Sequence, residues 1–135
     1  LRPVRRRRLA LLTAIVVVAA CGGDGASPDE RVFCTRLERL ADNDPFRVFG
    51  DRATPREVEL AFAALVARAD ELLDVAPGEA RAAARDFAES AAALDELLAA
   101  AGFDGAEVDA RAYRDQQVRY AEAAALLERY LDSEC

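Results

Sequence analysis

Beyond residue 27 the apolar residues recur at alternating intervals of three and four positions, which is the spacing of a helix with one buried face. Four runs of the chain follow this rule, and none has the two-residue alternation of a half-buried strand. Stripes this narrow are typical of helices in an antiparallel bundle, so the pattern predicts an all-α fold. The four series are Phe33, Leu37 and Leu40; Val58, Phe62, Leu65, Ala69, Leu72 and Ala76; Ala80, Ala84, Phe87, Ala91, Leu94, Leu98 and Ala101; and, with one polar member, Ala110, Tyr113, Gln117, Tyr120, Ala124, Leu127 and Leu131.

Residues that favour helix ends divide these runs. Residues 27–30 (Ser-Pro-Asp-Glu) and 54–57 (Thr-Pro-Arg-Glu) each offer a capping hydroxyl, a proline at the first helical position and a glutamate that can reach back. Residues 104–107 (Asp-Gly-Ala-Glu) are a looser version of the same device. Pro77 breaks the chain between two runs, and Gly102 is a natural helix stop. We therefore predict four helices, over about residues 28–42, 55–75, 79–101 and 106–132.

The first 21 residues follow a different pattern. Five arginines stand among the first eight residues, and a twelve-residue run that is apolar except for one threonine leads to Cys21. A membrane-spanning helix needs about 20 apolar residues, so this shorter run indicates a secretory signal peptide. Val18, Ala19, Ala20 and Cys21 resemble the lipobox of bacterial lipoproteins, with Val18 where leucine is commonest. An ordinary signal peptide that happens to end near a cysteine is the alternative.

The lipobox resemblance implies that Cys21 carries a diacylglycerol and is the first mature residue. It divides the chain into a signal peptide at 1–20, a flexible glycine-rich tether at 21–27 and a helical domain at 28–135. It also implies that the domain lies on the extracytoplasmic face of a bacterial cell membrane, anchored by the lipid. Residues 6–9 (Arg-Arg-Arg-Leu) loosely resemble a twin-arginine export signal, but a polybasic start explains them equally well, so the export route stays open.

The cysteines bear on the number of helices. Three are present, and if Cys21 carries lipid, Cys34 and Cys135 remain for one disulfide in an oxidising compartment. Two separate buried thiols are the alternative. With three helices of about 20 residues these cysteines would lie about 30 Å apart, whereas bridged cysteines need Cα atoms within about 7 Å. An even number of helices brings them together, so we predict an antiparallel up-down four-helix bundle with this disulfide.

Composition narrows the possible functions. After Ala20, 13 of the 18 basic residues remain against all 25 acidic residues, a formal charge of −12 that disfavours nucleic-acid binding. The chain has no histidine, so we expect no enzymatic activity. Adjacent acids such as Asp95 and Glu96 point in different directions on a helix and are expected to be solvated. Residues 42–44 (Asp-Asn-Asp) suit a helix end and lack a calcium-loop pattern, so we expect no metal and no cofactor.

Three phenylalanines gather at one end of the predicted bundle. Phe46 and Phe49 lie in the longest connection, at 42–54, and Phe103 lies in the turn before the fourth helix. They could be a plug that closes the bundle behind a short first helix, or an exposed patch that binds a partner. The favoured hypothesis is a non-enzymatic envelope lipoprotein that binds an unknown envelope protein through this end.

The fourth helix offers an alternative site. Tyr113, Gln117 and Tyr120 share its seam and could line a pocket for a small ligand or a lipid. The mostly alanine seam of the third predicted helix leaves little room for a cavity, which favours the alternative of a core seam with one polar residue that fixes the register. The mature chain loosely resembles small helical lipoproteins of high-GC Gram-positive bacteria, on the strength of a cysteine in the first helix, a cysteine at the end and no catalytic signature. Many of those proteins have no assigned activity, so the resemblance implies no ligand.

Overall fold

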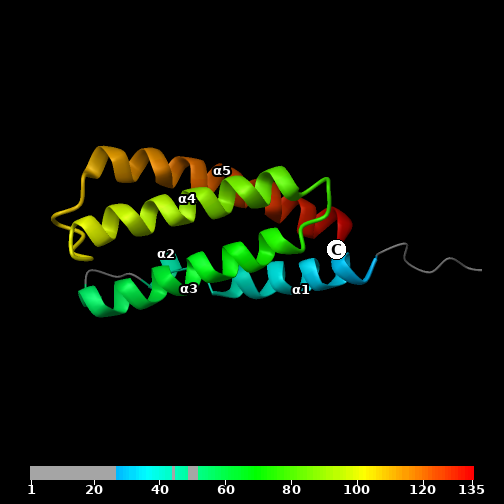
Figure 1. The fold of residues 1–135 in the computed structure, drawn as a ribbon, viewed down its shortest axis with the longest axis horizontal. Helices are drawn as coiled ribbons and strands as arrows, with labels where there is room; N and C mark the ends of the chain where they lie inside the picture. Colours follow the sequence, from blue (N-terminus) through cyan, green and yellow to red (C-terminus); the bar gives the residue numbers. More distant parts are fainter. Residues whose placement is uncertain (1–26, 44, 49–51) are drawn as a thin grey trace, which may run out of the picture.

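The computed structural model describes residues 27–43, 45–48 and 52–135 of the chain (Figure 1). This described part has four long helices, one short helix and no strand, so the predicted all-α bundle is confirmed. The long helices are α1 (Pro28–Asp42), α3 (Pro55–Asp74), α4 (Arg81–Ala100) and α5 (Ala110–Glu134), and the short one is α2 (Pro45–Val48).

Two of the predicted helix starts are confirmed in atomic detail. The Ser27 hydroxyl accepts the backbone N–H of Glu30 at 3.2 Å, and the Glu30 carboxylate accepts the N–H of Ser27 at 3.0 Å. Thr54 and Glu57 form the same reciprocal pair at the start of α3, at 3.3 and 2.7 Å. These bonds satisfy N–H groups that have no partner inside the helix, which is why α1 and α3 begin where the sequence predicts.

The other two predicted starts are wrong by a few residues. Helix α5 begins at Ala110 and not at 106, because the side chain of Asp109 accepts the N–H groups of Arg111 and Ala112 at 3.1 and 3.0 Å. Residues 104–107 form a turn ahead of it. Helix α4 begins at Arg81 and not at 79, because the N–H of Ala80 closes a tight turn onto the carbonyl of Pro77 at 3.0 Å.

The long helices surround the core in a fixed order of neighbours. Helix α4 packs against both α3 and α5, and α1 packs against α3 and α5 on the other side. No Cα atom of α3 lies within 8 Å of one of α5, so these two helices face each other diagonally. Figure 1 shows the start of α1, the α3–α4 turn and the C-terminus at one end, and the α4–α5 connection with the start of α3 at the other.

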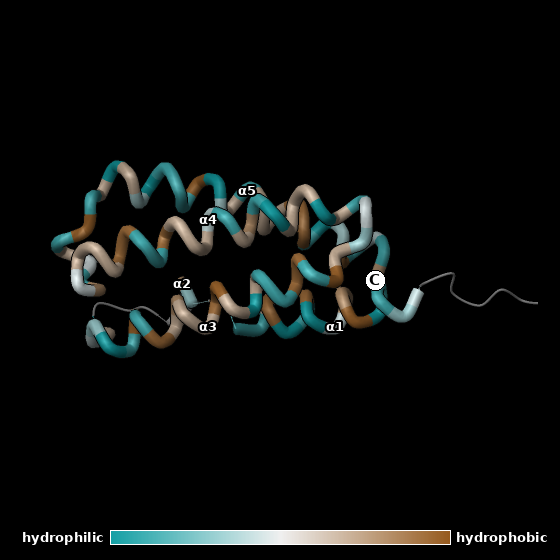
Figure 2. Tube along the Cα trace, viewed as in Figure 1, coloured by the Kyte–Doolittle hydropathy of each residue, from teal (hydrophilic) through white to brown (hydrophobic). Residues whose placement is uncertain are grey.

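The predicted apolar seams of α1, α3 and α4 form the core. Hydrophobic and hydrophilic residues alternate along each helix, as Figure 2 shows, and the seam residues of these three helices are buried except for their half-buried end members Val58 and Ala101. The seam of α5 behaves differently. Only Leu127 of that seam is fully buried, while Gln117 and Ala110 are exposed and the remaining members are half-buried. Helix α1, the neighbour of α5 on this side, has only 15 residues against 25 in α5, so α1 can cover only part of the α5 seam.

The predicted disulfide is confirmed. Cys34, near the start of α1, is bonded to Cys135, with an S–S distance of 2.03 Å and Cα atoms 5.7 Å apart. Helix α1 has only 15 residues, against 20 in α3 and α4 and 25 in α5. It therefore covers the bundle only over the half that holds the disulfide, and α2 packs against α3 beyond its end. The four-residue α2 was not predicted, since 45–48 fell inside an expected loop.

Candidate functional site

The half-exposed seam of α5 lines two pockets that follow one another along the helix. The distal pocket, at the end of the bundle that holds the α4–α5 connection, has a volume of about 390 Å³. The proximal pocket, towards the disulfide, has a volume of about 100 Å³. We call the two pockets together the groove; it follows the side of α5 that faces the short helix α1 and, beyond the end of α1, the helix α3.

The walls of the distal pocket are mainly apolar. Val58 and Phe62 of α3, Leu98 of α4 and Val108, which precedes α5, line this pocket. Sequence reasoning did not assign these residues to a site, because their spacing is that of ordinary core residues. The only signal in the sequence is the mismatch between the predicted length of the first helix and that of its neighbours, which leaves one corner of the bundle short of a helix.

Three polar side chains of α5 complete the distal pocket. Tyr113 is half-buried, and burial raises the pKa of its phenol above the ordinary value of 10.0, so it stays a hydrogen-bond donor. Arg114 and Gln117 are exposed and lie at the edge. Within the described chain, none of these three side chains forms a hydrogen bond or ion pair with another residue. The expectation that Gln117 could be a buried core residue is wrong, whereas Tyr113 and Gln117 do line one pocket.

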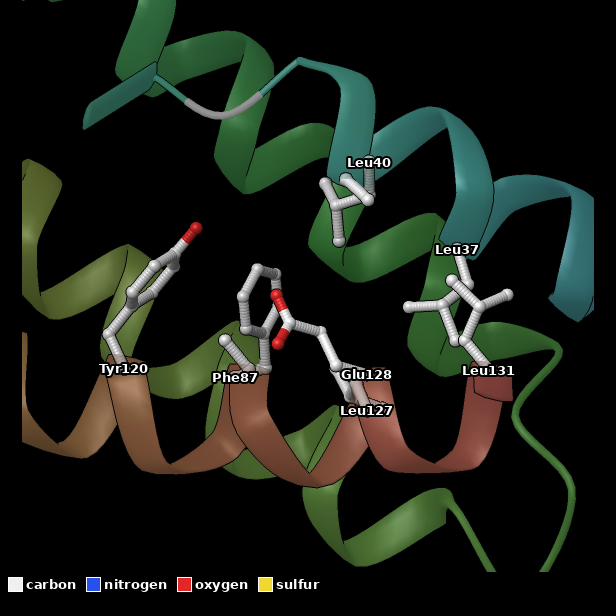
Figure 3. A pocket seen from close by; sticks show the side chains of 9 residues that line it. Leu37, Leu40, Phe87, Tyr120, Leu127, Glu128 and Leu131 are labelled. Carbon is white, nitrogen blue, oxygen red and sulfur yellow. The ribbon is translucent and has the colours of Figure 1, made fainter. Parts of the chain in front are cut away.

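The proximal pocket lies between α1 and α5 and is shown in Figure 3. Leu37 and Leu40 of α1 face Leu131 and Leu127 of α5 across it, and the exposed Glu128 brings one carboxylate to its edge. Tyr120, the third residue of the predicted ligand site, lines this pocket and not the distal one. The structure thus divides the predicted set between two adjacent pockets.

A cluster of aromatic rings stands at the boundary between the two pockets. Phe46 of α2 meets Phe62 edge-on, with ring centroids 5.8 Å apart, and meets Tyr120 at 5.0 Å. Tyr120 in turn lies 4.6 Å from Phe87. Edge-on and tilted rings at these separations attract each other by about 1 kcal/mol per pair. Phe46 is thereby held between a wall of the distal pocket and a wall of the proximal pocket.

The far-end phenylalanines have different positions in the structure. Phe46 is half-buried against the core, as is Phe103, while Phe49 lies outside the described residues. Phe103 takes a left-handed φ of 59° directly after Gly102, which has φ 63° and ends α4 as predicted. A non-glycine residue in this conformation costs about 1–2 kcal/mol, which packing against the core offsets. The contacts of Phe46 and Phe103 are those expected of a plug, and their role in binding a partner stays a prediction.

Chemically reactive groups are sparse in the described part of the chain. Ser90 is only 1% exposed, and its hydroxyl donates to the backbone carbonyls of Asp86 and Phe87 at 2.7 and 3.1 Å. Burial, assisted by the charges of Glu96 and Glu59, raises the pKa of Asp95 above its ordinary value. Neither group lines the distal or the proximal pocket.

The described residues show neither a metal-binding group nor a membrane-spanning helix. The described residues contain no group of three histidine, cysteine or acidic side chains arranged to hold a metal ion, and none of their helices is both long and apolar enough to cross a membrane. The predicted lipid attachment site, Cys21, lies outside them. A scan of protein-family models and searches of curated proteins and solved structures find no match to this chain.

Proposed function

We propose that this protein is a non-enzymatic, lipid-anchored binding module of the bacterial cell envelope, and that its distal pocket holds one small amphiphilic molecule with an anionic head. The observation that carries the proposal is the distal pocket itself, which the bundle leaves open along the seam of α5. Anchoring through Cys21 rests on the lipobox resemblance.

The size and walls of the distal pocket suit such a ligand. Pockets for small molecules are typically about 300–1,000 Å³, mainly apolar, with a few polar groups that fix orientation. The distal pocket has about 390 Å³, with Val58, Phe62 and Leu98 among its apolar walls. A body of several apolar carbons would be removed from water there, at about 0.8 kcal/mol for each buried methylene group.

The polar edge of the distal pocket favours an anion or a strong hydrogen-bond acceptor. Arg114 supplies a permanent positive charge, and Gln117 and Tyr113 supply neutral donors. Among the described residues, no acidic side chain lines this pocket, although the chain beyond Ala20 carries a formal charge of −12. A carboxylate or phosphate head at Arg114 would form a charge-assisted hydrogen bond with the guanidinium group.

The structure supports the protein-binding hypothesis less well than the ligand-binding proposal. Two of its three residues, Phe46 and Phe103, bury part of their rings against the core, which reduces the apolar area they can offer to a partner. A ligand in the groove needs no such rearrangement. Photo-crosslinking from position 49 in the native membrane tests the protein-binding hypothesis directly, because one dominant protein adduct would support it.

The binding proposal is tested by titrating the purified full chain, labelled with ¹⁵N, with octanoate and following the backbone NMR signals. We expect shifts confined to residues that line the distal pocket. Arg114→Glu should weaken binding at least about tenfold, as loss of a hydrogen bond to a charged group does. The matched control is Arg111→Glu, on the same helix but outside the walls of the distal and proximal pockets, which should leave the octanoate affinity within about twofold.

Two results would contradict the binding proposal. One is the absence of octanoate-induced shifts in a protein whose spectrum shows it to be folded. The other is an equal loss of affinity in Arg114→Glu and Arg111→Glu, which would mean that only the overall charge of α5 matters.

A further inference from the structure

We infer that Phe46 sets the length of the apolar chain that the groove accepts, because its ring closes the passage from the distal pocket to the proximal pocket. This inference rests on the proposed ligand-binding function of the distal pocket. It assigns a specificity role to a residue of the short helix α2, which is separate from the residues proposed to bind the head of the ligand.

The seam of α5 contributes residues to both pockets. Tyr113 and Gln117 of α5 line the distal pocket, and Tyr120, Ala124 and Leu131 of the same seam line the proximal pocket. From Tyr113 to Leu131 the seam extends for about 27 Å at 1.5 Å per residue. An apolar chain that enters at the distal pocket and follows the seam would therefore reach the proximal pocket next.

Phe46 stands at the junction of the two pockets. Its ring lies 5.8 Å from Phe62, a wall of the distal pocket, and 5.0 Å from Tyr120, a wall of the proximal pocket. The Phe46 ring meets Phe62 edge-on, at 90° between the ring planes, and meets Tyr120 at a tilt of 58°, so it contacts one wall residue of each pocket. Removing the Phe46 ring would open this junction.

The charges at the two pockets set the direction of the ligand. Arg114 lies at the edge of the distal pocket, and Glu128 lies at the edge of the proximal pocket, as Figure 3 shows for Glu128. An anionic head would be attracted by Arg114 and repelled by Glu128. The head therefore stays in the distal pocket, and only the apolar tail would extend towards Leu37 and Leu40 of the proximal pocket.

The experiment compares octanoate with hexadecanoate on the full chain by isothermal titration calorimetry, below the concentrations at which these acids form micelles. We expect the wild-type protein to bind hexadecanoate no more tightly than octanoate. In Phe46→Ala the affinity for hexadecanoate should rise at least about tenfold, since burying two additional methylene groups already provides that factor. The affinity for octanoate should stay within about twofold, because its contacts lie in the distal pocket.

A second variant tests whether the gain in hexadecanoate affinity depends on the proximal pocket. Ala124 is half-buried and lines that pocket, so Ala124→Phe should fill it. In the double variant with Phe46→Ala, the gain for hexadecanoate should disappear while octanoate still binds. Phe46→Leu, which keeps an apolar side chain without the ring, serves in place of Phe46→Ala if the alanine variant does not fold, with circular dichroism as the check of folding.

The possible results separate the two proposals. An unchanged ratio of the two affinities in a folded Phe46 variant, with octanoate bound normally, overturns the length inference alone. Tight hexadecanoate binding by the wild-type protein also overturns it. If the folded wild-type protein binds neither acid, the proposed function fails and this inference fails with it.

Discussion

The disulfide between Cys34 and Cys135 should be a major source of stability for this bundle. The sequence separation of the two cysteines is 101 residues, so in the unfolded state the bond closes nearly the whole domain into one loop. The chain-entropy relation gives about 4.7 kcal/mol for a loop of this length at 25 °C. Without the bond, α1 would be held mainly by Phe33, Leu37 and Leu40, its three buried side chains. We therefore expect the double replacement Cys34→Ala and Cys135→Ala to destabilise the protein by about 2–5 kcal/mol.

Urea unfolding followed by circular dichroism measures this effect. The midpoint should fall strongly in the double alanine variant, and wild-type protein kept in reducing agent should behave in the same way, which controls for the change of side chain. If the variant loses less than about 1 kcal/mol, the loop-closure reasoning is refuted. A first unfolding step that removes only the helical signal of α1 would instead indicate that this helix detaches separately from α3, α4 and α5.

Three further predictions concern single residues. Thr54→Ala removes the cap of α3 and should lower the free energy of unfolding by about 1 kcal/mol in urea titrations, with no change in the octanoate affinity. Ala91 is fully buried in α4, so Ala91→Leu should overpack the core and lower the thermal midpoint, at a cost of about 1–3 kcal/mol. Asp95 has a pKa raised by burial and by Glu96 and Glu59, so its ionised form is less favourable in the folded state, and Asp95→Asn should stabilise the protein at pH 7.

The pH dependence of Asp95→Asn provides its own control. Because folding raises the pKa of Asp95, the ionised carboxylate lowers the stability of the wild-type protein at pH values above the folded pKa. This loss of stability disappears once the pH falls below the ordinary pKa of 3.8, where the carboxyl is neutral in both the folded and the unfolded state. The stabilities of variant and wild type should therefore converge at acidic pH. A difference that stays constant from pH 7 to pH 3 would show that packing, and not charge, is responsible.

The sequence predicts the local features of this fold well, because they depend on neighbouring residues. A few neighbouring residues determine each of these features, namely the helix caps at Ser27 and Thr54 and the helix end at Gly102. The start of α5 was misplaced because Asp104 and Asp109 offer the same capping chemistry, and only the structure shows that Asp109 is used.

The groove could not be predicted in the same way, because it depends on which helices become neighbours. The seam of α5 has the same spacing as the other seams, yet it stays half-exposed, because α1 is ten residues shorter than α5 and cannot cover its whole length. The position of Phe46 between Phe62 and Tyr120 follows from the four-residue helix α2, for which the sequence has no periodic signal. The predicted ligand site rested on Gln117, which interrupts the apolar seam between Tyr113 and Tyr120, and of these three residues Tyr113 and Gln117 line the distal pocket.

The central claim is that the distal pocket holds a small anionic amphiphile, and native mass spectrometry of the protein purified from its own membrane tests it most directly. The account predicts one dominant adduct of small mass that dissociates as an anion. Val108→Trp, which fills the distal pocket, should abolish the adduct, whereas Val32→Trp, at an exposed position of α1 outside the walls of the distal and proximal pockets, should keep it. A folded wild-type protein with no adduct, or an adduct that persists in Val108→Trp, would contradict the account.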